Sequence, residues 1–168
     1  MTHEAATEEK YKAVSNLVYA SLHENGFAKR GRVFWKDLAD VRHLAEFQKS
    51  QKSTKDRIFF TMNVSTVVKA LLDPEIDDLD KMHGHEGHLY WRLGDFLSPQ
   101  EDKWWAVDQN SDPYQIAQEI SSILSSIVLR KLEQYSTVRA IVDLWSSEGY
   151  PPISDKRRKQ FLAELANR

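Results

Sequence analysis

The segment from Arg57 to Val68 reads RIFFTMNVSTVV, and its residues alternate in character with a period of two. One set of positions is almost wholly apolar, and the other carries small polar side chains between two apolar ends. The first set is Ile58, Phe60, Met62, Val64, Thr66 and Val68, and the second is Phe59, Thr61, Asn63, Ser65 and Val67. Alternation of β-branched and aromatic residues is typical of a strand, and the length predicts a central one.

Further strand signals lie on both sides of this segment, with short polar connections between several of them. We expect these strands at residues 33–38, 41–50, 88–93 and 103–108. Short connections between consecutive strands favour antiparallel pairing in a meander. The sequence therefore predicts an antiparallel sheet of about five strands with Arg57–Val68 at or near its centre.

Helical periodicity appears at the two ends of the chain. It predicts one helix over residues 7–25 and a long helix that Asp112 caps and that runs to about Tyr135. We expect the long helix to pack on the face of Phe60, Met62 and Val64. Two shorter C-terminal helices follow, capped by Ser136 and Ser154. The predicted fold is one α+β domain over residues 1–168, an antiparallel meander packed by an N-terminal helix and three C-terminal helices, with residues 1–6 disordered.

Composition excludes several classes of function. The chain has no cysteine, which excludes disulfides, thiolate catalysis and cysteine-ligated zinc. Its net charge of -2 creates no general attraction for nucleic acid or anionic membrane. It contains no signal-peptide core, no apolar run of the roughly 20 residues that span a bilayer, and no glycine loop or nucleophile motif of a cofactor-dependent or hydrolytic enzyme. We expect a cytoplasmic protein without a cofactor.

Several short motifs occur in a characteristic order along the first two thirds of the chain. They are Gly26-Phe27, Gly31-x-x-Phe34, Phe47-Gln48-Lys49-Ser50, the FTMNV part of the central strand, Trp91-Arg92-Leu93-Gly94 and Trp104-Trp105. In this order and spacing the chain resembles the bacterial family designated domain of unknown function 4304 (DUF4304), over roughly residues 8–110. The resemblance implies a bacterial single-domain protein and supplies no catalytic residue.

The polar set of the central strand is the first candidate for a functional site. In a meander it would share one sheet face with polar and aromatic residues of the neighbouring strands, among them Ser50 and Asp108. Our predicted ligand-binding residues are Gln48, Asn63, Tyr90, Arg92 and Trp104. Aromatic rings supply contact area and polar groups supply orientation, as in sites for small molecules or peptides. The alternative is an ordinary solvated sheet face.

Arg92 is the residue of this face on which the prediction depends most. Its guanidinium would emerge among Tyr90, Asn63 and Trp104, where it offers a planar fork to a carboxylate or phosphate. The alternative is an internal salt bridge, with Glu46 or Asp108 as the partner.

A second candidate is the run His83-Gly84-His85-Glu86-Gly87-His88, which follows the acidic stretch Asp73–Asp80. His83, His85 and His88 could bind a divalent metal, but their spacing matches no established metal motif, and a polar surface loop is the favoured interpretation. A third candidate is the basic run Lys156–Lys159, together with Lys29, Arg30 and Arg32. We interpret it as a solvated helix face and expect no nucleic-acid partner.

The sequence thus leaves two classes of function open. The favoured one is a non-catalytic binding or protein-interaction module, whose unknown protein or small-molecule ligand contacts the polar sheet face. The alternative is an enzyme of unrecognised type, metal-dependent through the His83–His88 loop. The sequence does not determine the oligomeric state.

Overall fold

The longest strand lies inside the sheet, as its alternation predicts. In this computed structural model, which describes residues 2–73, 79–147 and 153–168, strand β4 runs from Arg57 to Val68. It pairs antiparallel with β3 (Val41–Lys49) along one side. Two short strands, β5 (Leu89–Arg92) and β6 (Trp105–Asp108), share its other side. All six residues of the apolar set on β4 are buried, which confirms the predicted orientation of the strand.

The α+β class and the antiparallel sheet are confirmed, with two differences from the expected meander. The sequence does not predict β1 (Ala28–Arg30), which pairs with β2 (Val33–Asp37) at the edge beyond β3. In addition, β6 pairs with β4 instead of following β5 outward. The cause is length, because β4 has 12 residues while β5 and β6 have 4 each, so both fit end to end along one side of it.

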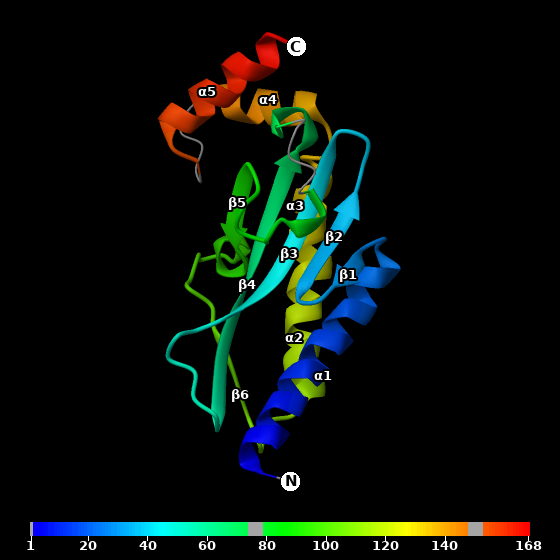
Figure 1. Cartoon of the computed structure of the whole chain (residues 1–168), viewed down its shortest axis with the longest axis vertical. Coiled ribbons are helices and arrows are strands. Elements are labelled where there is room, and N and C mark those ends of the chain that lie inside the picture. The colour runs from blue at the N-terminus through cyan, green and yellow to red at the C-terminus, as the bar shows by residue number, and fades with distance from the viewer. Residues whose placement is uncertain (1, 74–78, 148–152) are drawn as a thin grey trace.

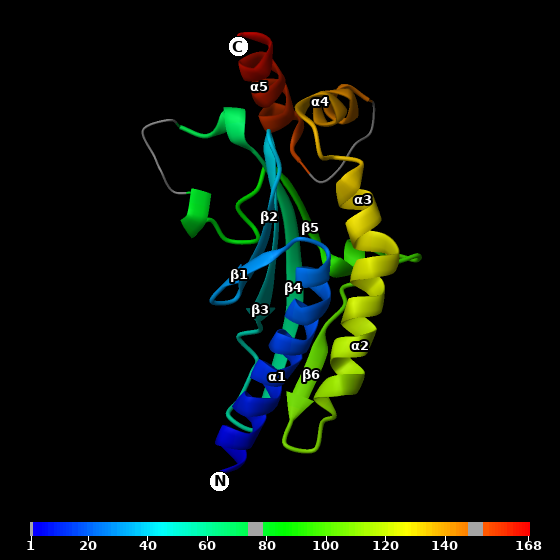
Figure 2. The same cartoon turned by 90° about the vertical axis from the view of Figure 1, so that its right-hand side faces the viewer.

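Helices cover the apolar face of the sheet. Helix α1 (His3–Glu24) and helix α2 (Pro113–Ile123) contact each other and lie on the same side of the strands (Figures 1 and 2). Ile120 and Leu124 belong to the same core as Phe60 and Met62. The expected packing of the long helix on this face is therefore confirmed.

Helix α1 begins at His3 instead of residue 7. The side chain of Thr2 accepts a hydrogen bond from the Ala5 amide and so caps the first turn. Thr7 is fully buried, and its hydroxyl donates to the Asp56 carbonyl, which fixes the next turn against the sheet. The expectation of disorder over residues 1–6 is therefore wrong for residues 3–6, while Met1 lies outside the described residues.

The long C-terminal helix is not uniform. A π-helical segment, η4 (Leu124–Val128), separates α2 from α3 (Leu129–Glu133). Two serine hydroxyls within this segment donate to carbonyls one turn back, in α2. Ser125 Oγ donates to the Ser121 carbonyl over 2.9 Å, and Ser126 Oγ donates to the Ser122 carbonyl over 2.6 Å. Such back-bonding competes with the backbone ladder and accompanies local changes of helix pitch.

Two short helices close one end of the sheet. They are α4 (Val138–Ser146) and α5 (Asp155–Ala166), and the rings of Trp145 and Phe161 lie 5.6 Å apart between them. Ser154 caps α5 as predicted, but Thr137, not Ser136, caps α4. Within the described ranges no helix has the length and apolarity that crossing a membrane requires.

Irregular chain lies over the opposite, polar face. Figure 2 shows the short 3-10 turns η1 (Lys69–Leu71) and η2 (Leu79–Lys81) on the side of the sheet away from α2. The chain then passes along the sheet through Gly84 and Gly87, both buried, to reach β5. After β5 a further 3-10 turn, η3 (Leu93–Phe96), leads toward β6.

Candidate ligand-binding site

Four of the five predicted ligand-binding residues line one pocket on the polar face. Its volume is about 580 Å³. The residues that line it are Arg32, Glu46, Phe47, Gln48, Lys49, Asn63, His85, Tyr90 and Arg92. Trp104 does not line the pocket, but its ring lies 5.4 Å from the guanidinium carbon of Arg92, which does.

Strand register brings these residues together. Asn63 of β4 lies opposite Glu46 of β3 on one side and Arg92 of β5 on the other. Because paired residues of an antiparallel sheet point to the same face, all three side chains emerge together. Asn63 lies between the other two and is therefore the centre of the site.

A row of hydrogen bonds fixes the pocket floor. The Asn63 side chain is nearly fully buried. Its Nδ2 donates to Gln48 Oε1 over 2.8 Å, and its Oδ1 accepts from the Tyr90 hydroxyl over 2.8 Å. Both ends of a buried amide are thus satisfied. Gln48 accepts through its oxygen, which leaves its NH₂ group as the part it can offer to a ligand.

Arg92 stands at the rim of the pocket. Its Nη1 donates to Asp102 Oδ1 over 3.1 Å, and the two side chains are 37% and 65% exposed. The partners expected from the sequence, Glu46 and Asp108, are therefore wrong. Glu46 is engaged by other donors, and Asp108 lies opposite Arg57 at the far end of β4. An exposed ion pair of this kind contributes little to stability, about 0–1 kcal/mol.

Glu46 is a structural carboxylate that sequence reasoning missed as part of the site. It is 4% exposed, and its oxygens accept from Arg32 Nε over 2.6 Å and from the Gly84 amide over 2.7 Å. His83 Nδ1 lies 3.2 Å from the same carboxylate. These contacts tie the β1–β2 turn and the His83–His88 loop to β3. Its position opposite Asn63 could have been found from the register, but its donors could not.

The His83–His88 loop carries exposed polar residues, as expected of a polar surface loop, but its two glycines are pressed against the sheet. A Cβ atom on Gly84 would lie 2.7 Å from Glu46 Cβ, and one on Gly87 would lie 2.5 Å from Ser65 Cβ. Any residue other than glycine would force the loop away from the strands. The two glycines therefore hold the loop against the polar face. The pocket lies beside the loop, at His85.

The three imidazoles of this loop do not converge on one point. The rings of His83 and His85 stack with centroids 5.9 Å apart. His88 turns away, with its Nδ1 accepting from the Val68 amide over 2.9 Å and its ring packed on Phe161. In residues 2–73, 79–147 and 153–168 no group of three or more histidine, aspartate or glutamate side chains could hold a metal ion. The acidic residues Glu75, Asp77 and Asp78 lie outside the described residues.

The other polar residues expected on this face serve its structure. Thr61 Oγ1 donates to the Lys103 carbonyl over 2.8 Å, and Ser65 is covered by Gly87. Ser50 starts the turn between β3 and β4, and Asp108 accepts from Asn110 and Ser111 beyond the end of β6. The polar set thus divides into residues that hold the sheet together and residues that face the pocket.

The basic residues considered for nucleic-acid binding lie in two separate places. Lys156–Lys159 belong to α5 at one end of the sheet, whereas Lys29, Arg30 and Arg32 belong to the β1–β2 hairpin (Figure 1). Within the run, Arg158 pairs with Asp155 and Arg157 packs over Phe161. The two groups therefore form no continuous basic surface.

The pocket itself has a cationic character. Arg32, Lys49 and Arg92 line it, and Glu46 is the only carboxylate among the described residues that do so. Since that carboxylate already accepts from Arg32 and the Gly84 amide, the pocket presents mainly donors to a ligand. The Gln48 NH₂ group beside an arginine fork suits an anionic oxygen group.

Comparison with protein families identifies one match, to the model of a domain of unknown function, DUF4304, over residues 18–134. Searches of curated proteins and of solved structures find no match. The matched range includes β1 to β6, the pocket and the long helix through α3, and it ends before α4. Because it covers more than half of the chain, the protein belongs to the DUF4304 family.

Proposed function

We propose that the protein is a non-catalytic binding module, which holds a carboxylate-bearing ligand in the pocket on the polar sheet face. The observation that carries this proposal is the Gln48–Asn63–Tyr90 row, a set of mutually hydrogen-bonded groups around the buried Asn63 side chain, at the floor of a pocket with Arg92 at its rim. Groups fixed before binding lose little conformational entropy when a ligand arrives. A bacterial cytoplasm is the setting that the sequence predicts for this activity.

The charges of the pocket support a carboxylate as the bound group. Arg92 has two side-chain hydrogen-bond partners, Asp102 and the Tyr90 hydroxyl, which do not use all of its five N–H groups. The remaining N–H groups and the Gln48 NH₂ group lie on the same face, and a ligand carboxylate would find a bidentate donor and a second donor there.

The same contacts favour binding over catalysis. Glu46 is the obvious candidate for a general base, but it accepts two short hydrogen bonds, one of them from a guanidinium. Both of its oxygens therefore already have donors within the fold. The metal-dependent alternative has less support, because His88 faces Val68 and Phe161 and not the other two imidazoles.

A titration with glutarate tests the proposal. Amide NMR signals of residues around the pocket should shift on addition of glutarate, and its uncharged analogue glutaramide should bind at least tenfold more weakly. Arg92→Ala should weaken glutarate binding by at least about tenfold, since a hydrogen bond to a charged group contributes about 1.5–3 kcal/mol. Its free energy of unfolding should stay within about 1 kcal/mol of the wild type.

Arg57→Ala is the matched control. Arg57 also lies on the polar face beside an aromatic ring, with its guanidinium carbon 5.1 Å from the Phe59 centroid, but it does not line the pocket. The Arg57→Ala variant should bind glutarate with the affinity of the wild type. Equal losses in the two variants, equal binding of glutaramide, or shifts confined to other parts of the sheet would refute the proposal. A blocked Ala-Glu-Ala peptide distinguishes an acidic protein side chain from a small molecule as the source of the carboxylate.

A further inference from the structure

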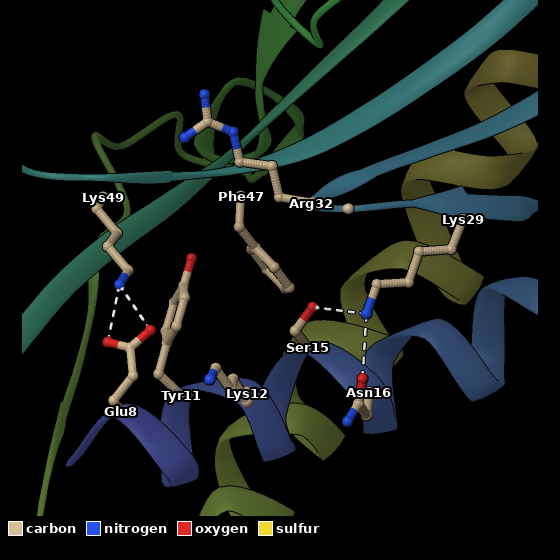
Figure 3. A pocket seen from close by; sticks show the side chains of 10 residues that line it. Glu8, Tyr11, Lys12, Ser15, Asn16, Lys29, Arg32, Phe47 and Lys49 are labelled. Atoms are coloured by element: carbon tan, nitrogen blue, oxygen red, sulfur yellow. Dashed lines mark hydrogen bonds and ion pairs between the residues drawn. The ribbon is translucent and has the colours of Figure 1, made fainter. Parts of the chain in front are cut away.

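A second pocket lies at the end of β3 on the side of the sheet that α1 covers, between α1 and the β1–β2 turn (Figure 3). Its volume is about 510 Å³. The residues that line it are Glu8, Tyr11, Lys12, Ser15, Asn16, Lys29, Gly31, Arg32, Phe47 and Lys49. It exists because β2 begins at Val33, opposite Glu46, so that β3 continues past the end of its neighbour and leaves a gap above α1.

Aromatic rings form the floor of this pocket. Phe47 points into it from β3, and Tyr11 stands beside it on α1 (Figure 3). Both rings pack edge-on against Phe60, with centroids 5.3 Å and 5.2 Å from it, so the floor is part of the rigid core. Burial raises the pKa of Tyr11 to about 12, which keeps its hydroxyl protonated and able to donate at neutral pH. The floor therefore suits a flat apolar group.

Lys29 is the unusual charge of this pocket. Its Nζ donates to Asn16 Oδ1 over 3.0 Å and lies 3.4 Å from Ser15 Oγ. The rings of Tyr19 and Phe34 are each 5.7 Å away, and partial burial lowers the pKa of the ammonium group. All these partners are neutral, and no carboxylate of the described chain lies within ion-pair distance of it.

Lys49 shows what a paired lysine in the same pocket looks like. Its Nζ donates to both carboxylate oxygens of Glu8, over 3.1 Å and 2.9 Å. Among the described residues that line the pocket, Glu8 is the only carboxylate, against the cationic side chains of Lys12, Lys29 and Lys49 and that of Arg32, which pairs with Glu46 outside the pocket. The whole chain carries a net charge of -2, so this positive excess is local.

We propose that this pocket is a second ligand site, which binds an anion with a planar apolar body, such as an aromatic carboxylate. The ring would lie against the partly exposed Tyr11, above the buried Phe47, and the carboxylate would take the place of the missing counter-ion beside Lys29. The cationic side chains at the rim also favour a ring by cation–π contact. The two pockets share Arg32, Phe47 and Lys49 in their linings, but Lys29 and Tyr11 line only this one, so they distinguish the second site from the pocket on the polar face.

The probe for this site is 2-naphthoate, with naphthalene-2-carboxamide as its uncharged analogue. Addition of 2-naphthoate should shift the amide signals of α1 around Tyr11–Asn16 and of the β1–β2 hairpin, and the carboxamide should bind at least tenfold more weakly. Lys29→Met keeps the apolar stem of the side chain and removes the charge. It should weaken 2-naphthoate binding at least tenfold.

Arg30→Met is the matched control. Arg30 neighbours Lys29 on the same short strand but does not line this pocket, so its variant should bind 2-naphthoate within twofold of the wild type. Arg92→Ala should also leave 2-naphthoate binding within twofold, which separates this site from the glutarate pocket. Shifts outside the pocket, a carboxamide that binds as tightly as the acid, or Lys29→Met binding equal to that of Arg30→Met would overturn the proposal.

Discussion

The two faces of the sheet are closed in different ways. On the apolar face, α1 and the helix from Pro113 to Glu133 bury a continuous core of aliphatic and aromatic side chains. On the polar face, a coil segment approaches the strands at Gly84 and Gly87, and named hydrogen bonds hold it there. The first covering depends on buried area, and the second depends on individual contacts.

This difference explains why the proposed carboxylate site lies on the polar face. Apolar side chains adapt to one another and fill the space between a sheet and its helices. A loop held by individual hydrogen bonds covers the sheet only as far as those bonds extend. Here the loop stops covering the polar face at His85, which lines the pocket. Beyond that point the buried side chains of Asn63 and Glu46 have hydrogen-bond partners within the fold. One of these partners, Gln48, is exposed to solvent.

Replacement of Phe60 should give the largest effect and measures the apolar covering. Phe60 is fully buried, and its ring contacts those of Tyr11, Phe47 and Trp105. Phe60→Ala should lower the free energy of unfolding by about 3–5 kcal/mol in denaturant titration. Phe59→Ala removes the same ring from the other face, where Phe59 is only half-buried, and should cost clearly less. Equal losses would show that the two faces are packed alike.

Acidification should have the next largest effect. It acts on one histidine that the helices cover and on one that belongs to the loop over the polar face. His43 lies under the helices, with Nδ1 2.8 Å from Thr66 Oγ1, and His88 lies at the end of the loop. Burial lowers the pKa of each to about 4. The unfolded chain, with histidine pKa values near 6.5, binds more protons between these values, so stability falls as the pH drops.

The expected loss between about pH 7 and about pH 5 is up to roughly 2 kcal/mol for each histidine. His88→Asn keeps a hydrogen-bond acceptor near the Val68 amide and removes the titrating group. In chemical denaturation at the two pH values, this variant should lose about half as much stability as the wild type. A variant with the full pH dependence of the wild type would show that His88 is not held neutral.

Periodicity was enough to predict the main architecture. The alternation in Arg57–Val68 identified the central strand and both of its faces, and Asp112-Pro113 marked the start of the long helix. The short strand β1 carries Lys29 and Arg30 in three residues, too few for any period to appear. The place of β6 depends on the unequal lengths of β4 and β5, which no local pattern contains.

The residues of the candidate site that lie on paired strands were predictable from the sequence. Gln48, Asn63, Tyr90 and Arg92 lie on adjacent strands, so one face of a correctly ordered sheet brings them together. Arg32 and His85 enter from a turn and a loop, whose paths follow from close contacts and not from repeating patterns. The glycines of the loop were a usable signal, because glycines that alternate with histidines beside a strand suit close backbone approach.

Removal of one hydroxyl from each face should give the smallest effect and the finest comparison. The Tyr90 hydroxyl donates to Asn63 Oδ1, whose side chain has almost no contact with water. Tyr90→Phe should therefore lower the free energy of unfolding by about 1–2 kcal/mol, the usual cost of a buried acceptor left without its donor. The Tyr11 hydroxyl makes no hydrogen bond to any described residue, and Tyr11→Phe should change stability by less than about 0.5 kcal/mol. Denaturant titration of both variants measures the difference directly. If Tyr90→Phe costs no more than Tyr11→Phe, the hydrogen-bonded row does not hold the polar face, and the fixed pocket floor on which the binding proposal depends is wrong.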